Sequence, residues 1–221
     1  MLGDSDELLI PEEETGQIAI ERFCIAQGER RTWGPEDKER LYFLLDARGS
    51  FAVGAVGARW NYDVRPDTVL WVPVRLEYTL ENSGDARMRG VVFTVDLTEV
   101  EMERRKEAPG SPTIRDLHAM PQRNMVSFLT RTVLLGKEVA AKAIELSEYQ
   151  TLLPGGSVPR HFHQSREEVC YVCRGLGRLL LENETKTVSA GEAVRIRAAS
   201  WHSMRNESED VLEYILVQAS V

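Results

Sequence analysis

The sequence is poor in cysteine and in net positive charge, and both shortages exclude classes of protein. Its three cysteines are an odd number and too few for a disulfide framework. Its 27 basic residues are scattered and are outnumbered by 35 acidic residues, which gives a net charge of -8. We therefore expect neither a disulfide-stapled scaffold nor a nucleic-acid partner.

Long hydrophobic runs are also lacking. No stretch approaches the roughly 18 apolar residues that a membrane-spanning helix needs. The amino terminus is acidic and lacks the basic start and apolar run of a secretory signal. The sequence therefore predicts a cytoplasmic protein with no membrane partner. Hydrophobic residues make up 43% of the chain, enough for a packed core in one large domain or two small ones.

Short apolar or alternating runs, separated by Gly, Asn, Asp or Pro, dominate the 221 residues. Examples are TVLWVPVRLEYTLENSGD, RGVVFTVDL and DVLEYILVQAS. Runs of this kind predict strands, and many short strands at even spacing predict a sandwich or barrel. PEDKERLYFLL and GKEVAAKAIEL resemble helices, but each is short enough to be a helical turn that leads into a strand. The expected fold class is all-β.

Histidine is scarce, yet two of the four histidines stand one residue apart in RHFHQSREEVCYVCRG. In an extended strand residues i and i+2 share a face, so His161 and His163 are expected to point together. Glu168 on the next strand can face the same interior, and His202 in SWHSMRN is the candidate for a fourth ligand. Three imidazoles and a carboxylate suit a divalent transition metal. A lone histidine is more often a surface or core residue than a ligand, and we interpret His118, in the polar segment RDLHAMP, as a surface residue.

The stretch GGSVPRHFHQSREEVCYVCRG resembles the first motif of the cupin superfamily. In that motif a glycine, here Gly156, precedes the H-x-H pair, and a second glycine, here Gly175, follows the glutamate. GEAVRIRAASWHSMRN resembles the second motif, with Gly191 at its start and Asn206 four residues after the histidine. It departs from the motif at Arg197 and Ala199, where the family has proline and glycine, which affects the turn more than the ligands.

The resemblance implies a jelly-roll β-barrel with a metal inside one end. The implied ligands are His161, His163, Glu168 and His202, which would hold one divalent transition metal per chain: Fe, Mn, Ni, Cu or Zn. About two positions of an octahedral ion would stay open for water, substrate or dioxygen. Because cupins often pair through barrel edges, a homodimer is the default expectation.

The first half of the chain resembles the second half, but without ligands. WVPVRLEYTLENSGD has Tyr78 where the histidine of the second motif belongs, with Asn82 four residues later. If Gly49 is aligned with Gly177, the other ligand positions, His161, His163 and Glu168, fall opposite Trp33, Pro35 and Arg40. The first half is expected to serve in packing, by covering the edge or mouth of the second barrel. The alternative is a metal-free pocket in which Trp33, Arg40 and Tyr78 hold a ligand.

The chain therefore resembles a bicupin, which implies two cupin jelly-roll β-barrels joined by a connector. The expected domains are a degenerate barrel at 1–98, a polar connector at 99–136 and the metal-binding barrel at 137–221.

Strand alternation also predicts residues that line the pocket. Cys170 and Met204 each stand two residues beyond a candidate ligand, and Trp201 is expected at the mouth. We interpret Met204 and Trp201 first as ordinary barrel lining, and Cys170 first as a small buried hydrophobic residue. Arg195 and Arg197 share a strand face, where they could bind an anion or lie in solvent, and we expect the solvated face. No residue is assigned a catalytic role.

The expected function is that of a metal-dependent cupin enzyme acting on a small polar metabolite. The family includes dioxygenases, decarboxylases, isomerases and lyases, and fold alone does not choose among them. The alternative is a non-catalytic protein that binds or senses a small molecule anchored on the metal. A vestigial, purely structural site is a third hypothesis, against which the intact ligand set argues.

Overall fold

The structure of the chain is a computed structural model. It describes residues 5–10, 16–46, 48–55, 58–97, 110–126, 128–136, 139, 141 and 143–221, with the backbone only at 55, 58 and 59. The described residues form strands and one short 3-10 helix, which agrees with the all-β prediction.

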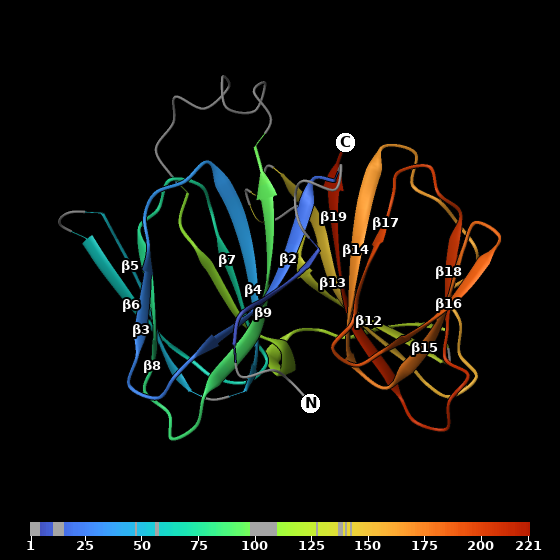
Figure 1. Ribbon diagram of the computed structural model, residues 1–221, viewed down its shortest axis with the longest axis horizontal. Helices are drawn as coiled ribbons and strands as arrows, with labels where there is room; N and C mark the ends of the chain where they lie inside the picture. The colour runs from blue at the N-terminus through green and yellow to red at the C-terminus, as the bar shows by residue number, and fades with distance from the viewer. Residues whose placement is uncertain are drawn as a thin grey trace.

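The strands fall into two halves along the chain (Figure 1). The first half contains β1 (Glu7–Ile10), β2 (Ile18–Ile25), β3 (Arg30–Trp33), β4 (Lys38–Asp46), β5 (Gly49–Ala55), β6 (Ala58–Val64), β7 (Thr68–Val72), β8 (Tyr78–Asn82), β9 (Met88–Asp96) and β10 (Thr113–Asp116). After η1 (Leu117–Ala119), the second half contains β11 (Arg123–Val126), β12 (Leu129–Leu135), β13 (Ile144–Leu152), β14 (Arg166–Arg174), β15 (Leu176–Leu181), β16 (Glu184–Ser189), β17 (Ala193–Ile196), β18 (His202–Arg205) and β19 (Leu212–Ser220).

Each half pairs a six-stranded sheet with a smaller one. In the first half the orders are β1-β2-β9-β4-β7-β10 and β3-β8-β5-β6. In the second half they are β11-β12-β13-β19-β14-β17 and β16-β15-β18. The run β2-β9-β4-β7 thus has the same order as β13-β19-β14-β17, and β8-β5-β6 the same order as β18-β15-β16. In Figure 1 the two large sheets lie side by side at the centre, and the small sheets lie on the outer sides.

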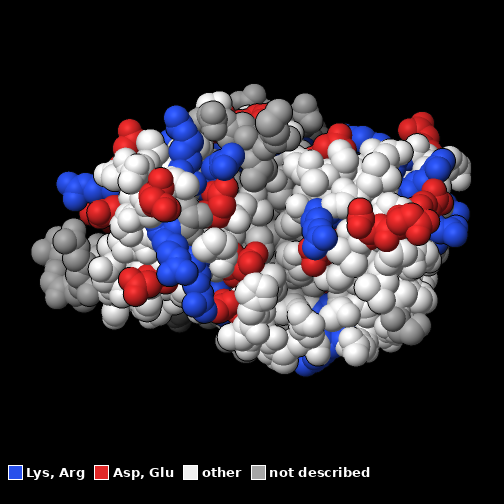
Figure 2. Space-filling model, turned by 90° about the horizontal axis from the view of Figure 1, so that it is seen from below, with Lys and Arg blue, Asp and Glu red and all other residues white. Residues whose placement is uncertain are grey.

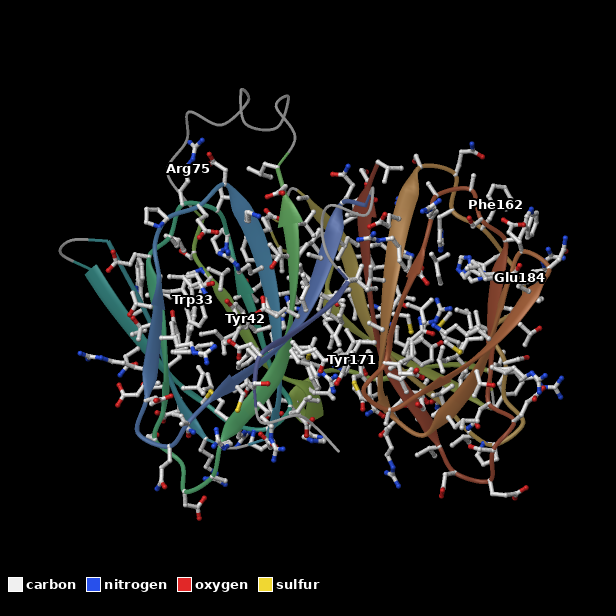
Figure 3. The ribbon with its side chains drawn as sticks, in the orientation of Figure 1. Trp33, Tyr42, Arg75, Phe162, Tyr171 and Glu184 are labelled. Carbon is white, nitrogen blue, oxygen red and sulfur yellow. The ribbon has the colours of Figure 1, made fainter. Side chains whose placement is uncertain are left out.

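The central strands of the large sheets are buried on both faces, because their successive side chains alternate between two apolar cores. In β14, Val169 and Tyr171 belong to the cluster of apolar side chains from both halves, whereas Cys170 and Val172 belong to the interior of the second half. Tyr171 accordingly lies between the halves in Figure 3. A strand buried on both faces needs apolar residues at successive positions, which explains unbroken runs such as VLWV in β7.

Two buried glutamates reach across between the halves. Glu39 of β4 accepts hydrogen bonds from the backbone N–H groups of Ala143 and Ile144, at 3.0 and 3.1 Å. In the opposite direction, Glu167 of β14 accepts one from the N–H of Ile18, at 3.0 Å. Because these carboxylates are buried and hydrogen-bonded to backbone, they fix the register of one half against the other.

The expectation of a solvated face for Arg195 is wrong. Its side chain is only 9% exposed; its Nη2 donates to the carbonyl of Ile18, and its Nε lies 3.4 Å from a carboxylate oxygen of Glu167. The reason is that β17 packs against the first half, so the outer face of the second barrel is not in solvent there. In contrast, Arg197 is exposed.

The segment 99–136, interpreted from the sequence as a connector, supplies strands to both halves. β10 pairs with β7 of the first large sheet, and β12 pairs with β13 of the second. These strands are short, so the alternation of apolar and polar residues within them was too brief to predict strands from the sequence. Residues 99–109 and 127 lie outside the described residues, and the domain limits 1–98, 99–136 and 137–221 stay a prediction. The helix-like run at 35–45 is mostly strand β4, and 144–146 of the other run begins β13.

Two fully buried asparagines have matching hydrogen bonds in the two halves. The Asn82 side-chain amide donates to the carbonyls of Ile25 and Ala86, and its oxygen accepts from Gly84. The Asn206 amide donates to the carbonyls of Leu152 and Asp210, and its oxygen accepts from Ser208. Each asparagine therefore ties its turn to a neighbouring strand.

Replacing either asparagine with alanine is expected to lower the free energy of unfolding by about 1–3 kcal/mol, because buried backbone groups lose their partners. Urea denaturation of Asn82→Ala and Asn206→Ala measures this. Asn61→Ala is the matched control, since Asn61 is exposed on β6. A loss no larger than that of the control would mean that these hydrogen bonds contribute nothing net.

Candidate metal centre

The backbone brings His161 and His202 opposite one another. The two residues form an antiparallel bridge in which each backbone N–H donates to the carbonyl of the other, at 2.9 and 2.8 Å. His163 follows two residues later, and its carbonyl accepts from the N–H of Ala199 at 2.7 Å. These backbone hydrogen bonds thus bring the three histidines together at the edge of the small sheet.

The three imidazoles form a compact cluster. One ring nitrogen of each of His161, His163 and His202 lies within 4.8 Å of the others. The ring centroids of His161 and His202 are 4.2 Å apart, and those of His161 and His163 are 5.0 Å apart. Two nitrogens bound to one ion through bonds of about 2.0–2.1 Å are at most about 4.2 Å apart, so only small movements of the rings would let them share an ion.

Two of the rings are held in the orientation that a metal requires. Nδ1 of His161 lies 2.8 Å from the carbonyl oxygen of Pro159, and Nδ1 of His202 lies 3.0 Å from that of Ser200. A carbonyl only accepts, so each Nδ1 carries a proton in these contacts, and in the neutral form of the ring the lone pair is then on Nε2. Both Nε2 atoms are therefore the available metal-binding atoms.

Glu168 of β14 lies beside this cluster of three histidines. Its carboxylate oxygens lie 3.3 Å from Nε2 of His163 and 3.6 Å from Nε2 of His202, and its side chain is 3% exposed. Gln218, opposite Glu168 on β19, donates to the carboxylate at 2.9 Å and has its amide nitrogen 3.2 Å from the His163 ring. Gln218 therefore orients two of the candidate ligands.

The residues present fit a divalent transition metal. Burial lowers the pKa of His202, which favours the neutral imidazole that binds metals. Its buried Nε2 has no hydrogen-bond partner among the described residues. A buried nitrogen with a lone pair and no donor is costly unless something binds it. Three neutral imidazoles and one carboxylate are also a common ligand set for such ions.

The cluster opens into a cavity of about 160 Å³ inside the second half. Cys170 and Met204 line this cavity beside the histidines and Glu168. Burial raises the pKa of the Cys170 thiol well above its usual value, so the side chain stays a neutral thiol.

The structure places Trp201 elsewhere than at the cavity wall. Its side chain is 42% exposed and packs on Phe162, with ring centroids 4.6 Å apart and the Arg160 guanidinium 5.5 Å from the indole. Trp201 and Phe162 both precede a histidine that faces inward, and successive residues of an extended chain point to opposite sides. In Figure 3 Phe162 lies at the outer edge of the second half.

Sequence reasoning missed a buried polar chain on the cavity wall. The Tyr214 hydroxyl donates to the Gln150 side chain at 2.6 Å, and the Gln150 amide donates to Glu148 at 2.7 Å. Arg131 follows, with its Nε 3.8 Å from the Glu148 carboxylate. Alternation predicts these positions: Glu148 and Gln150 on β13, and Tyr214 and Gln218 on β19, are spaced by even numbers along strands whose other face is buried between the halves.

The first half has different chemistry at the equivalent positions. Trp33 and Tyr78 are register partners, as His161 and His202 are, and their rings stack with centroids 5.1 Å apart. Arg40 of β4 takes the position of Glu168 in β14, since each faces the equivalent partner strands.

The alignment of Pro35 with His163 is off by one residue. The carbonyl of Glu36 accepts from the N–H of Arg75, as the carbonyl of His163 accepts from that of Ala199. Arg75 and Ala199 also share a positive φ, at 61° and 60°. The first half has one residue fewer between this position and β4, which an alignment anchored on Gly49 does not detect.

A double-sheet jelly roll with a histidine cluster inside one end defines the cupin class of fold. Residues 148–218 match the family model described as "Cupin domain", which supports placing the chain in the cupin superfamily.

Solved structures share the fold over the whole chain. Lactobacillus farciminis oxalate decarboxylase in a formate complex has a TM-score of 0.81 at 13% identity, covering 100% of this chain and 83% of that one. A mutant of Bacillus subtilis oxalate decarboxylase has a TM-score of 0.79 at 12% identity, covering 100% and 76%. A structure of the Bacillus subtilis enzyme with Mn(II) centres has a TM-score of 0.77 at 13% identity, covering 98% and 74%. No curated protein matches the sequence.

Basic and acidic side chains are interspersed on the face shown in Figure 2. Within the described ranges, no helix is long and apolar enough to cross a membrane.

Proposed function

We propose that the chain is a metal-dependent cupin enzyme that acts on a small polar metabolite. The observation that carries the proposal is the cluster of three imidazole nitrogens within 4.8 Å, with the Glu168 carboxylate beside it in a cavity. We assign His161, His163, Glu168 and His202 as the residues that hold one divalent ion per chain. When bound, such an ion supplies Lewis acidity toward a substrate oxygen.

Arg131 supports a substrate with a negative charge. It lines the same cavity, and its buried Nε has no hydrogen-bond partner among the described residues. The Glu148 carboxylate, 3.8 Å from this nitrogen, is too far for a hydrogen bond, so an anionic acceptor at closer range would stabilise it. The cavity of about 160 Å³ limits the substrate to a few heavy atoms. A small carboxylic acid satisfies both the charge and the size.

The side chains around the cavity would have different roles toward such a substrate: binding it, positioning the metal ligands and excluding water. Arg131 would bind the carboxylate, and Gln218 would hold His163 and Glu168 in place. Leu179, Ile196 and Leu216 form apolar wall on the remaining sides and restrict the entry of water. Manganese is a reasonable first choice of metal, because Mn(II) centres are named for one structure with the same fold.

The test is turnover by metal-loaded protein with a panel of oxalate, keto acids, diols and catechols, following oxygen uptake and carbon dioxide release. Oxygen consumption indicates an oxygenase or an oxidase, and carbon dioxide release without oxygen consumption indicates a decarboxylase. Saturable binding with no product from any compound favours the second function, a metal-anchored sensor, over an enzyme.

Glu168→Gln is expected to lower turnover at least about tenfold, because it keeps the shape of the side chain but removes the charge that balances the ion. Initial rates at saturating metal measure this. Glu184→Gln is the matched control, since Glu184 is exposed on β16. Equal rates for both variants would remove Glu168 from the assigned ligand set.

The proposal includes three expectations about the chain as a whole. The first half would be a degenerate second cupin, a view supported by the shared strand order and the matching asparagine hydrogen bonds. The protein would be cytoplasmic, and it would form a homodimer. Sedimentation of the purified protein tests the last point.

A further inference from the structure

The first half contains a larger cavity than the candidate metal centre. Its volume is about 660 Å³, within the range of about 300–1,000 Å³ that is usual for small-molecule sites. Residues of β2, β3, β4 and β9 line it, together with Asp6 and Leu8. Because β2, β4 and β9 are the counterparts of β13, β14 and β19, this cavity occupies the same place in its half as the metal cavity does in the second half.

This cavity has no imidazole, since all four histidines lie elsewhere in the chain. A guanidinium, that of Arg40, stands where Glu168 stands in the second half. The Arg40 side chain is only 13% exposed. The Tyr78 ring fills the position of His202, and its hydroxyl lies 2.5 Å from that of Tyr42, so the deepest part is packed and the cavity lies above it. In Figure 3 Trp33 and Tyr42 lie inside the first half.

The positive charge in this cavity therefore comes from the Arg40 guanidinium rather than from a metal ion. Arg40 donates to Glu36, whose side chain is 43% exposed, so solvent screens this ion pair. Arginine is always protonated and carries five N–H donors, and it can bind a further carboxylate beside the one it has. The geometry of a guanidinium matches both oxygens of a carboxylate.

The other charged residues that line the cavity also affect which ligand it can bind. Three basic residues, Arg31, Lys38 and Arg40, line the cavity with two acidic residues, Asp6 and Glu21. Asp6 already accepts hydrogen bonds from Arg31 and from the N–H of Cys24, and Lys38 lies 3.3 Å from Asp96. Burial and the neighbouring Asp6 raise the pKa of the Glu21 carboxyl.

Apolar surface accompanies these charges. Trp33, Phe23, Leu8 and Val92 contribute to the lining. An aromatic indole wall beside a guanidinium binds planar or apolar groups that end in a negative charge.

We propose that the first-half cavity is a metal-independent binding site for a small carboxylate with an aromatic or apolar body. The carboxylate binds Arg40, and the body lies against Trp33 and Phe23. This site is separate from the metal centre, and it does not depend on the function proposed for the second half.

Calorimetric titration with phenylacetate and its neutral analogue phenylacetamide tests the proposal. The two probes share a ring, and only the carboxylate can form a charge-assisted pair. Wild-type protein is expected to bind phenylacetate about tenfold more tightly than phenylacetamide, the difference that a hydrogen bond to a charged group contributes. Arg40→Gln is expected to abolish this preference, and Arg40→Lys to retain part of it.

Two controls locate the site. Arg178→Gln removes an exposed arginine that pairs with Glu207 in the second half, and it is expected to keep the preference. Glu168→Gln alters the metal centre and is also expected to keep it. Equal binding of the two probes by wild-type protein overturns the proposal even if an Arg40 variant does not fold. A preference that disappears in Glu168→Gln but persists in Arg40→Gln overturns it as well, because the anion would then bind in the second half.

Discussion

Replacing His163 with alanine is expected to remove the bound metal. Wild-type protein expressed without added metal should contain about one transition metal ion per chain, and His163→Ala less than about a tenth of that, because loss of a ligand costs at least as much affinity as the 10–100-fold lost when a ligand's supporting hydrogen bond is removed. His163 contributes one of three clustered nitrogens and also contacts Glu168 and Gln218. Elemental analysis by plasma mass spectrometry measures the metal content and names the metal.

His118→Ala is the matched control for this measurement. His118 is exposed and pairs with Asp67, in a part of the fold that is remote in sequence from the cluster. Its loss is expected to leave the metal content unchanged. If neither wild-type nor His118→Ala protein contains metal after reconstitution with Mn, Fe, Zn, Ni and Cu salts, the metal-dependent function is wrong, while the first-half site stays testable.

Truncating Phe93 to alanine is expected to lower the free energy of unfolding by about 3–5 kcal/mol. Phe93 is fully buried on the central strand β9, in the apolar cluster to which both halves contribute. Its removal leaves a cavity that residues from two large sheets would have to fill, and the hydrogen-bonded sheets limit that collapse. Urea denaturation monitored by circular dichroism measures the change.

Trp60→Ala is the control for Phe93→Ala. Trp60 is 45% exposed on β6, and its truncation is expected to change the free energy of unfolding by no more than about 0.5 kcal/mol. Similar losses for both variants would mean that the contact between the halves does not contribute to the stability of the fold. A change in the slope of the transition with Phe93→Ala would indicate that the halves unfold separately.

The β character and the histidine cluster could be predicted because both depend on local pattern. Alternation within a strand places His161 and His163 together, and the motif spacing brings Glu168 and His202 to them. Contacts between distant strands could not be predicted in this way. Gln218 lies 50 residues after Glu168 and carries no motif, although it directly binds that carboxylate.

Two expectations failed because their causes lie outside the local pattern of a strand. Arg195 was expected in solvent because its alternation with apolar neighbours is the same for a solvated face and for a face covered by a second sheet. Pro35 was aligned with His163 because one residue is missing from the loop before β4. Neither a covering sheet nor a shortened loop changes the local pattern of the strand itself.

The two adjacent glutamates of β14 give this strand a double role. Glu167 faces the first half and binds the backbone of Ile18, whereas Glu168 faces the histidines. A deletion of one residue upstream in β14 would exchange the two faces, moving the candidate ligand into the contact between the halves. Position 167 is therefore constrained by the contact between the halves, and position 168 by the metal centre. Homologous chains should keep the length of β14 even where they lack the metal ligands.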